Sequence, residues 1–197
     1  MTQSENLSAA PVAGEAPVRR LPGEVGVWVF ICGDMLVFAL LFFVYLYYRA
    51  ESLDSFQYSQ QALSTVVGLL NTLVLLASSW FVARFMGAFR QGELLVARRF
   101  LLCAVAAALT FVGVKFFEYS SKIATGHTLL SGDFFMYYYM MTGIHLLHVL
   151  VGLAGLLYLL TVVGKRETSH MLVECAAVYW HMVDLLWIFL FPLLYLI

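Results

Sequence analysis

Five ionisable residues lie deep inside long apolar segments, and their types are those that transfer protons, bind metals or form buried hydrogen bonds. They are Asp34, His145, His148, His181 and Asp184. His145 and His148 have an i,i+3 spacing, which places both on one side of a helix. His181 and Asp184 repeat that spacing. A charge in a bilayer costs about 2.5–3.5 kcal/mol on insertion scales, so we expect these side chains to face a polar protein interior, lipid headgroups or water.

Other polar residues extend this layer. Asn71 adds an amide to a second apolar segment, and Lys115 and Glu118 share one helix face in a third. The simplest packing turns all of these groups inward, where they hydrogen-bond one another. The predicted lipid cleft and buried polar network comprise Asp34, Asn71, Glu118, His145, His148, Glu174, His181 and Asp184.

Four interpretations of this layer remain open. The first is a structural network that fixes helix register and cradles lipid headgroups. The second is a haem site, the third a metal centre, and the fourth a pathway for protons or solutes. Haem ligation requires two imidazoles that face each other, such as His148 and His181, but a nearby acid favours a local hydrogen bond. A metal centre lacks the paired Glu-x-x-His arrangement of di-iron bundles. The structural interpretation is preferred, and a pathway is permitted by any intramembrane Asp or His.

The elements that must position these residues are five apolar segments, each long enough to cross a bilayer as a helix. About 20 apolar residues span the hydrocarbon core. Hydrophobic residues make up 62% of the 197 residues and charged residues only 12%. The sequence therefore predicts an all-α, polytopic membrane protein in which residues 23–197 form one domain. The expected helices cover about residues 25–48, 64–85, 100–119, 134–163 and 173–197.

Residues 1–22 have a different composition, rich in Ala, Pro, Ser and Glu, which predicts a disordered cytoplasmic tail. The tail does not read as a signal peptide, because the apolar run begins only at Val25 and is too long for an h-region. The near-neutral net charge of −1 argues against a nucleic-acid partner. Cys32, Cys103 and Cys175 show no CxxC spacing, so we interpret them as small apolar core residues.

The positions of Lys and Arg predict the membrane orientation. Eight of the eleven basic residues would share one side, and the positive-inside rule makes that side cytoplasmic. The N-terminus is then cytoplasmic and, after five crossings, the C-terminus lies outside. The eight residues are Arg19, Arg20, Arg84, Arg90, Arg98, Arg99, Lys165 and Arg166.

Several segments resemble one family, haem-copper oxidase subunit III. Residues 179–191 (YWHMVDLLWIFLF) resemble its last-helix signature, and residues 142–149 (TGIHLLHV) are similar to its penultimate helix. Residues 30–38 (FICGDMLVF) are similar to its acid-bearing helix, with Asp where many members have Glu. Residues 70–79 and the pair at 118–119 fit as well. Five motifs in the family's order cover nearly the whole membrane portion.

The resemblance implies an arrangement and a partner. Mitochondrial-type members have seven helices, and this chain looks like the last five. The family implies a V-shaped bundle, with two helices on one side and the rest on the other, and phospholipid in the cleft. Asp34 and His148 are the preferred candidates for that cleft. The implied partners are the catalytic subunit I, other subunits of the same oxidase or reductase, and membrane phospholipid. The implied location is the bacterial cytoplasmic membrane.

The resemblance also implies that haem and copper belong to partner subunits. The family's catalytic subunits use six histidines for two haems and a copper, whereas this chain has five histidines in all. We therefore expect a cofactor-free, non-catalytic subunit III that stabilises the catalytic subunit and supports proton uptake. One alternative is an accessory protein of a nitric oxide reductase, since short five-helix members accompany such enzymes. The other is a stand-alone transporter or channel, against which the lack of a sequence repeat counts.

Overall fold

The computed structural model describes residues 23–164 and 168–197. The tail expected at 1–22 lies outside the described residues, as do Lys165 and Arg166. Within the described residues the chain is entirely helical, which confirms the all-α prediction. Its helices are α1 (Val25–Glu51), α2 (Leu53–Gln60), α3 (Thr65–Arg90), α4 (Leu94–Ala124), α5 (Asp133–Val162) and α6 (His170–Tyr195).

Five of these helices are long and apolar enough to cross a membrane, as expected: α1, α3, α4, α5 and α6. They contain 26 to 31 residues, so at about 1.5 Å per residue each is roughly 39–47 Å long. This exceeds the hydrocarbon thickness of about 30 Å, and the surplus turns reach into the interfaces. The chain is therefore an integral membrane protein.

The helix ends differ from the predicted ones mainly because polar residues continue the helices beyond the apolar core. α4 begins at Leu94 and includes Arg98 and Arg99, whereas the sequence predicted a start near residue 100. Long basic side chains can stay in a helix while their charged ends reach the interface. The short α2 was not predicted, since it is mostly polar, although it buries Phe56.

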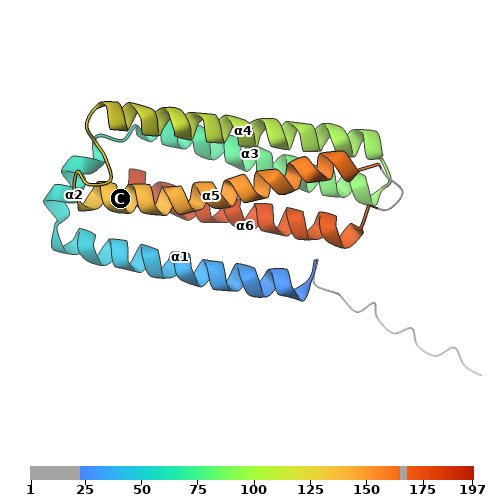
Figure 1. Ribbon diagram of the computed structural model, residues 1–197, viewed down its shortest axis with the longest axis horizontal. Helices are drawn as coiled ribbons and strands as arrows, with labels where there is room; N and C mark the ends of the chain where they lie inside the picture. The colour runs from blue at the N-terminus through green and yellow to red at the C-terminus, as the bar shows by residue number, and fades with distance from the viewer. Residues whose placement is uncertain (1–22, 165–167) are drawn as a thin grey trace, which may run out of the picture.

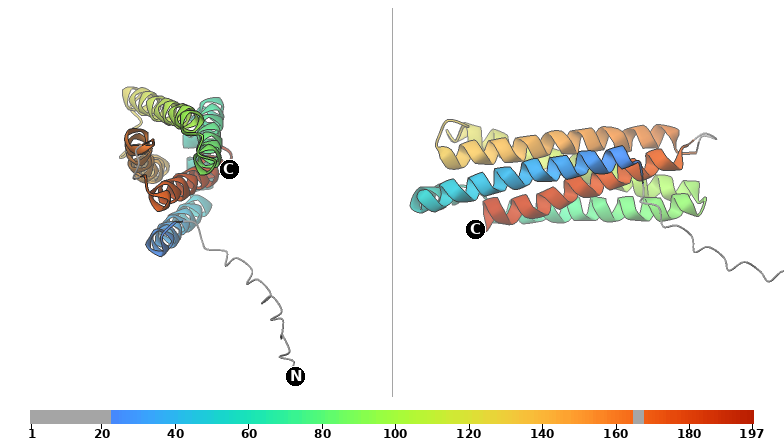
Figure 2. Two further views of the ribbon diagram at one scale, coloured as in Figure 1. Left: turned by 90° about the vertical axis from the view of Figure 1, so that its right-hand side faces the viewer. Right: turned by 90° about the horizontal axis from the view of Figure 1, so that it is seen from below.

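The helices form a closed four-helix bundle with one helix outside it. α3, α4, α5 and α6 each pack against two neighbours in a ring, and α1 packs against α5 and α6 from outside. Figure 2 shows this arrangement in the view along the helices, and Figure 1 shows α1 set apart from the other long helices. The expected V with two helices on one side is therefore wrong in this detail. The ring closes because α3 and α6 pack closely.

Glycine permits close packing against α6 at two places, one on α3 and one on α5. A Cβ atom on Gly68 of α3 would lie 2.8 Å from the Tyr195 ring of α6. A Cβ atom on Gly152 of α5 would lie 2.8 Å from the Trp180 ring. Both distances are too short for a real contact, so only glycine lets these backbones approach so closely. This use of small residues is typical of membrane helix interfaces.

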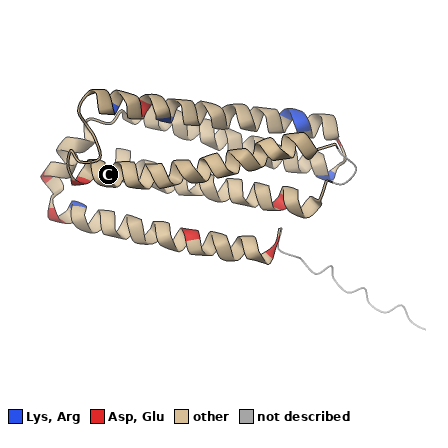
Figure 3. Cartoon of the chain, in the orientation of Figure 1, with Lys and Arg blue, Asp and Glu red and all other residues tan. Residues whose placement is uncertain are grey.

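α1 contacts the bundle through a narrow seam. Its buried residues are Ile31, Phe38 and Tyr45, which are spaced seven apart. A seven-residue spacing places one side chain every two turns along a single face. The rest of α1 is largely exposed, for example Leu36 at 71% and Phe43 at 71%. Most charged residues gather toward the two ends of the helices (Figure 3).

Candidate functional site

The polar pair that joins α1 to α5 consists of Asp34 and His148. Oδ1 of Asp34 lies 3.1 Å from Nε2 of His148, and the two side chains are only 12% and 15% exposed. Nδ1 of His148 lies 2.8 Å from the carbonyl oxygen of Ile144. Because a carbonyl oxygen only accepts, Nδ1 carries a hydrogen in this arrangement. Nε2 is then the ring nitrogen that faces the Asp34 carboxyl group.

Aromatic rings shield this pair. The Phe38 ring meets the His148 ring edge-on, with centroids 5.7 Å apart. The Tyr179 hydroxyl donates to the carbonyl oxygen of His148 at 3.3 Å, and its ring lies 6.2 Å from that of Phe30. Water is thus largely excluded around the pair, and low polarity strengthens the interaction between the two groups.

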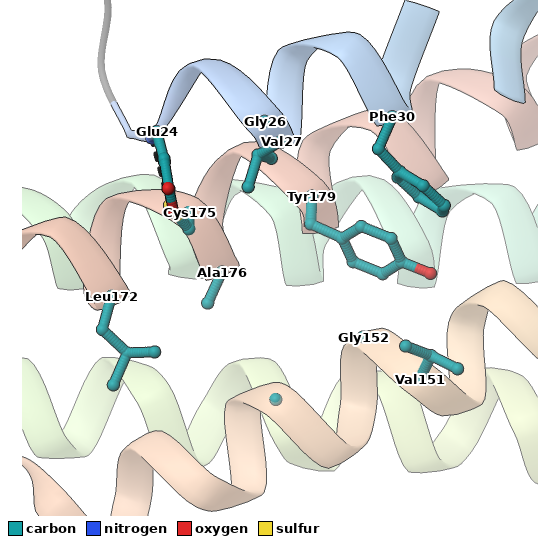
Figure 4. A pocket seen from close by; sticks show the side chains of 11 residues that line it. Glu24, Gly26, Val27, Phe30, Val151, Gly152, Leu172, Cys175, Ala176 and Tyr179 are labelled. Atoms are coloured by element: carbon teal, nitrogen blue, oxygen red, sulfur yellow. Dashed lines mark hydrogen bonds between the residues drawn. The ribbon is translucent and has the colours of Figure 1, made fainter. Parts of the chain in front are cut away.

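An apolar groove lies beside the pair, between the N-terminal half of α1 and helices α5 and α6. Its volume is about 450 Å³. Figure 4 shows Phe30 and Tyr179 at one end and Leu172 toward the other, with Glu24 near the start of α1. A Cβ atom on Gly155, which lines the groove, would meet nothing within 4 Å. The groove therefore has space for an apolar chain.

A second polar group links α3 and α6. Oγ of Ser79 lies 2.6 Å from Nδ1 of His181, and the serine is also close to the Asp184 carboxyl group. His181 therefore faces α3, whereas His148 faces α1. Since both nitrogens of His148 already have partners, the geometry gives no support to haem ligation by these two histidines.

A third group is a buried ion pair near the other end of the bundle. Lys115 Nζ donates to Glu118 at 2.9 Å and to the Tyr195 hydroxyl at 2.9 Å. Tyr195 in turn donates to Glu118 at 2.6 Å. The Lys115 ammonium also lies 4.6 Å from the centre of the Trp187 ring. The triangle ties α4 to the end of α6, with each charge compensated by hydrogen bonds.

Glu174 lies near the start of α6 rather than in the middle of the bundle. It accepts from the Gly23 backbone N–H at 3.1 Å and from Arg90 at 3.0 Å. These contacts tie the segment that enters α1, the end of α3 and the start of α6 together.

The remaining candidates, Asn71 and His145, point into the four-helix bundle. Asn71 is 1% exposed and His145 is 0% exposed. Neither side chain has a hydrogen-bond partner among the described residues. The single network expected from the sequence is therefore divided into separate groups. The reason is geometric, because residues three apart on a helix point about 60° apart and can meet different neighbours.

Ser79 and Tyr195 take part in these groups but were not among the predicted site residues. Ser79 belongs to one of the five sequence motifs, so its position gave a weak signal. Tyr195 lies in the last apolar segment, where a tyrosine is typical of the interface. Lys115 was visible as the partner of Glu118 through its i,i+3 spacing.

Fold and site together define a polytopic helical membrane protein whose buried polar residues form several separate groups. Comparison with known families makes the assignment specific: the chain belongs to the cytochrome c oxidase subunit III family, whose family model matches residues 17–197. The resemblance drawn from the sequence motifs is thereby confirmed.

Individual relatives agree with this assignment. A probable cytochrome c oxidase subunit 3 of Mycobacterium bovis is 30% identical over the full length of both chains. A cytochrome c oxidase subunit 3 of Thermostichus vulcanus is 31% identical over 88% of this chain and 86% of its own. A haem-copper oxidase subunit I+III of Aeropyrum pernix is 30% identical over 86% of this chain. The match spans only 22% of that longer relative.

Proposed function

We propose that this chain is the non-catalytic subunit III of a haem-copper terminal oxidase complex and that it stabilises the catalytic subunit during turnover. The observation that carries the proposal is the match to subunit III along essentially the whole membrane portion. Catalysis of oxygen reduction then belongs to the partner. The complex would lie in a bacterial cytoplasmic membrane.

The partner in this proposal is subunit I. Support comes from the Aeropyrum pernix relative, whose name joins subunits I and III in one protein. The exposed apolar surface of α1 offers room for helix contacts with such a partner. In this proposal the redox groups reside on the partner, and His148 and His181 serve in contacts with neighbouring side chains or backbone.

Phospholipid is the second component of the proposal. The groove between α1, α5 and α6 is mainly apolar and has a volume of about 450 Å³. An acyl chain would lie along it past Gly155 and Leu172, with the headgroup near the end where α1 begins. A lipid held there would fill the space between α1 and the bundle, and α1 would keep its position beside Asp34 and His148.

A role in proton uptake completes the proposal. The Asp34–His148 contact places two titratable side chains next to each other in a largely buried position. At the end of the bundle where α1 begins, Arg90 and Glu174 form an ion pair at 3.0 Å. That end is the cytoplasmic one in the orientation predicted from the basic residues. Charged groups there would assist delivery of protons to the neighbouring catalytic subunit.

The proposal is tested by purification of the complex through an affinity tag on this chain. We expect a large haem-containing subunit to co-purify and oxygen consumption to be the activity of the complex. The isolated chain should contain no stoichiometric iron or copper. Stoichiometric metal on the isolated chain would overturn the proposal. A partner that reduces nitric oxide but not oxygen would assign the chain to a nitric oxide reductase instead.

A further inference from the structure

The interior of the bundle formed by α3, α4, α5 and α6 contains polar atoms that have no hydrogen-bond partner among residues 23–164 and 168–197. Asn71, His145, Trp180 and Asp184 are all at most 5% exposed. Both side-chain polar atoms of Asn71, both ring nitrogens of His145, Nε1 of Trp180 and Oδ1 of Asp184 lack partners within the described part of the chain. Buried polar atoms in folded proteins are nearly always hydrogen-bonded, to protein or to ordered water.

Asn71 and His145 occupy one layer of the bundle. The His145 ring lies 5.2 Å from the Trp187 ring and 6.0 Å from the Phe111 ring. Nε1 of Trp187 donates to Thr72, the neighbour of Asn71, at 2.9 Å. Polar groups therefore approach this layer from α3 and α5, with two aromatic rings between the helices.

The packing of α3 on α4 also indicates that Asn71 lies at the same height in the bundle as Phe111, and therefore as His145. These consecutive helices are joined by a short turn and run antiparallel, and Ser78 of α3 donates to the carbonyl oxygen of Ala104 in α4 at 2.9 Å. Seven residues, or about two turns, lead back from Ser78 to Asn71 in α3 and forward from Ala104 to Phe111 in α4. Because the helices are antiparallel, both steps go in the same direction along the bundle. Asp184 and Trp180 occupy the next two turns of α6 along the face that bears Trp187.

We propose that this part of the bundle binds water molecules, which bridge Asn71 to His145 and extend to Asp184 and Trp180. The atoms are of the types that buried water binds, since each such molecule makes two to four hydrogen bonds to polar groups. An amide supplies donors and an acceptor, a neutral imidazole supplies one of each, the indole supplies a donor and the carboxyl group an acceptor. The inference is independent of the identity of the partner subunit.

Bound water would connect two of the polar groups described above. Asp184 lies three residues from His181, which contacts Ser79. At the other limit, Trp187 lies against the Lys115 ammonium. The water-filled layer would thus fill the gap between the Ser79–His181 contact and the Lys115–Glu118–Tyr195 triangle. The polar interior would then extend along most of the bundle length.

Radiolytic footprinting of the full chain in its purified complex tests the proposal. Hydroxyl radicals formed from bound water oxidise side chains next to that water even where bulk solvent has no access. Phe111 and Phe85 are both 0% exposed in the same bundle, which makes Phe85 a matched control. We expect Phe111 to be oxidised several times faster than Phe85. Equal, low rates for the two residues would overturn the proposal.

A double substitution, Asn71→Leu with His145→Leu, gives a second readout. It removes the polar groups of one layer together, so the layer should become dry and the Phe111 rate should fall to that of Phe85. Thr110→Val is the control, because Thr110 is exposed and its hydroxyl donates to the carbonyl oxygen of Ala106 in its own helix. An unchanged Phe111 rate in the double variant contradicts the proposal. If that variant does not assemble, the ratio in the unsubstituted complex still decides.

Discussion

Nε2 of His148 lies 3.1 Å from Oδ1 of Asp34, and the other ring nitrogen of His148 is held by a backbone carbonyl of its own helix. The orientation of the imidazole is therefore held by α5 itself as well as by α1. α1 contributes a narrow buried seam, so this polar contact is a substantial part of what positions α1. The relationship links the position of α1 on the bundle to one polar pair.

Replacement of Asp34 by Ala should weaken assembly and turnover stability more than the initial rate. Loss of the carboxylate leaves a largely buried imidazole without its partner, which costs about 1–3 kcal/mol. The half-life of oxygen consumption during turnover and the yield of complex should fall together. Asp34→Glu, which keeps the acid, is the control. A collapse of the initial rate in a fully assembled complex would contradict this role.

The Asp34–His148 contact should also appear as energetic coupling. We expect the combined variant Asp34→Asn/His148→Gln to lose less thermal stability than the sum of the two single variants. Residues in direct contact typically couple by about 0.5–3 kcal/mol. The measurement is a double-mutant cycle on the unfolding temperature of the complex in detergent. Additive losses would show that the two residues act separately.

Both residues of this pair could be predicted as candidates from the sequence, because an acid or an imidazole deep in an apolar segment is costly unless it has a partner. Which partner each would take could not be predicted. The i,i+3 spacing places His145 and His148 on the same side of their helix. In the structure His145 nevertheless points into the bundle, whereas His148 points toward α1. That difference depends on the crossing of α1 over α5, which no local spacing encodes.

The same limit applies to the helix arrangement. The five spans follow from apolar length, a property of each segment alone. Closure of the α3–α6 ring depends on Gly68 meeting Tyr195, two residues far apart in the sequence. The V expected from the resemblance was wrong in this detail because pairing between distant segments decides the arrangement. Ser79 and Tyr195 were missed as site residues for the same reason.

Gly68→Ala should destabilise the bundle more than Gly113→Ala. The new methyl at residue 68 would lie 2.8 Å from the Tyr195 ring, whereas at residue 113 it would meet nothing within 4 Å. Overpacking of this kind costs typically about 1–3 kcal/mol. The unfolding temperatures of the two variants provide the comparison. Equal temperatures would mean that Tyr195 moves aside without loss.

Gly155→Leu should reduce the phospholipid that remains with the purified complex. Residue 155 lines the groove and has open space beside it, so a larger side chain would occupy the room proposed for an acyl chain. Lipid bound per complex can be measured by mass spectrometry after detergent exchange. Gly113→Leu, at a position that does not line this groove, is the control. Unchanged lipid content in the Gly155 variant would argue against a lipid in this groove.

Lys115→Met should be among the most destabilising single substitutions in the bundle. It leaves the Glu118 carboxylate, whose side chain is 6% exposed, without its compensating charge. Removal of one partner from a buried ion pair costs about 3–5 kcal/mol, whereas removal of both together is far better tolerated. We therefore expect Lys115→Met/Glu118→Gln to recover much of the lost unfolding temperature, and Tyr195→Phe to have the smallest effect of the three. If the double variant is as unstable as Lys115→Met, the loss does not come from an unpaired carboxylate, and the packing of the Lys115 side chain against Trp187 becomes its cause.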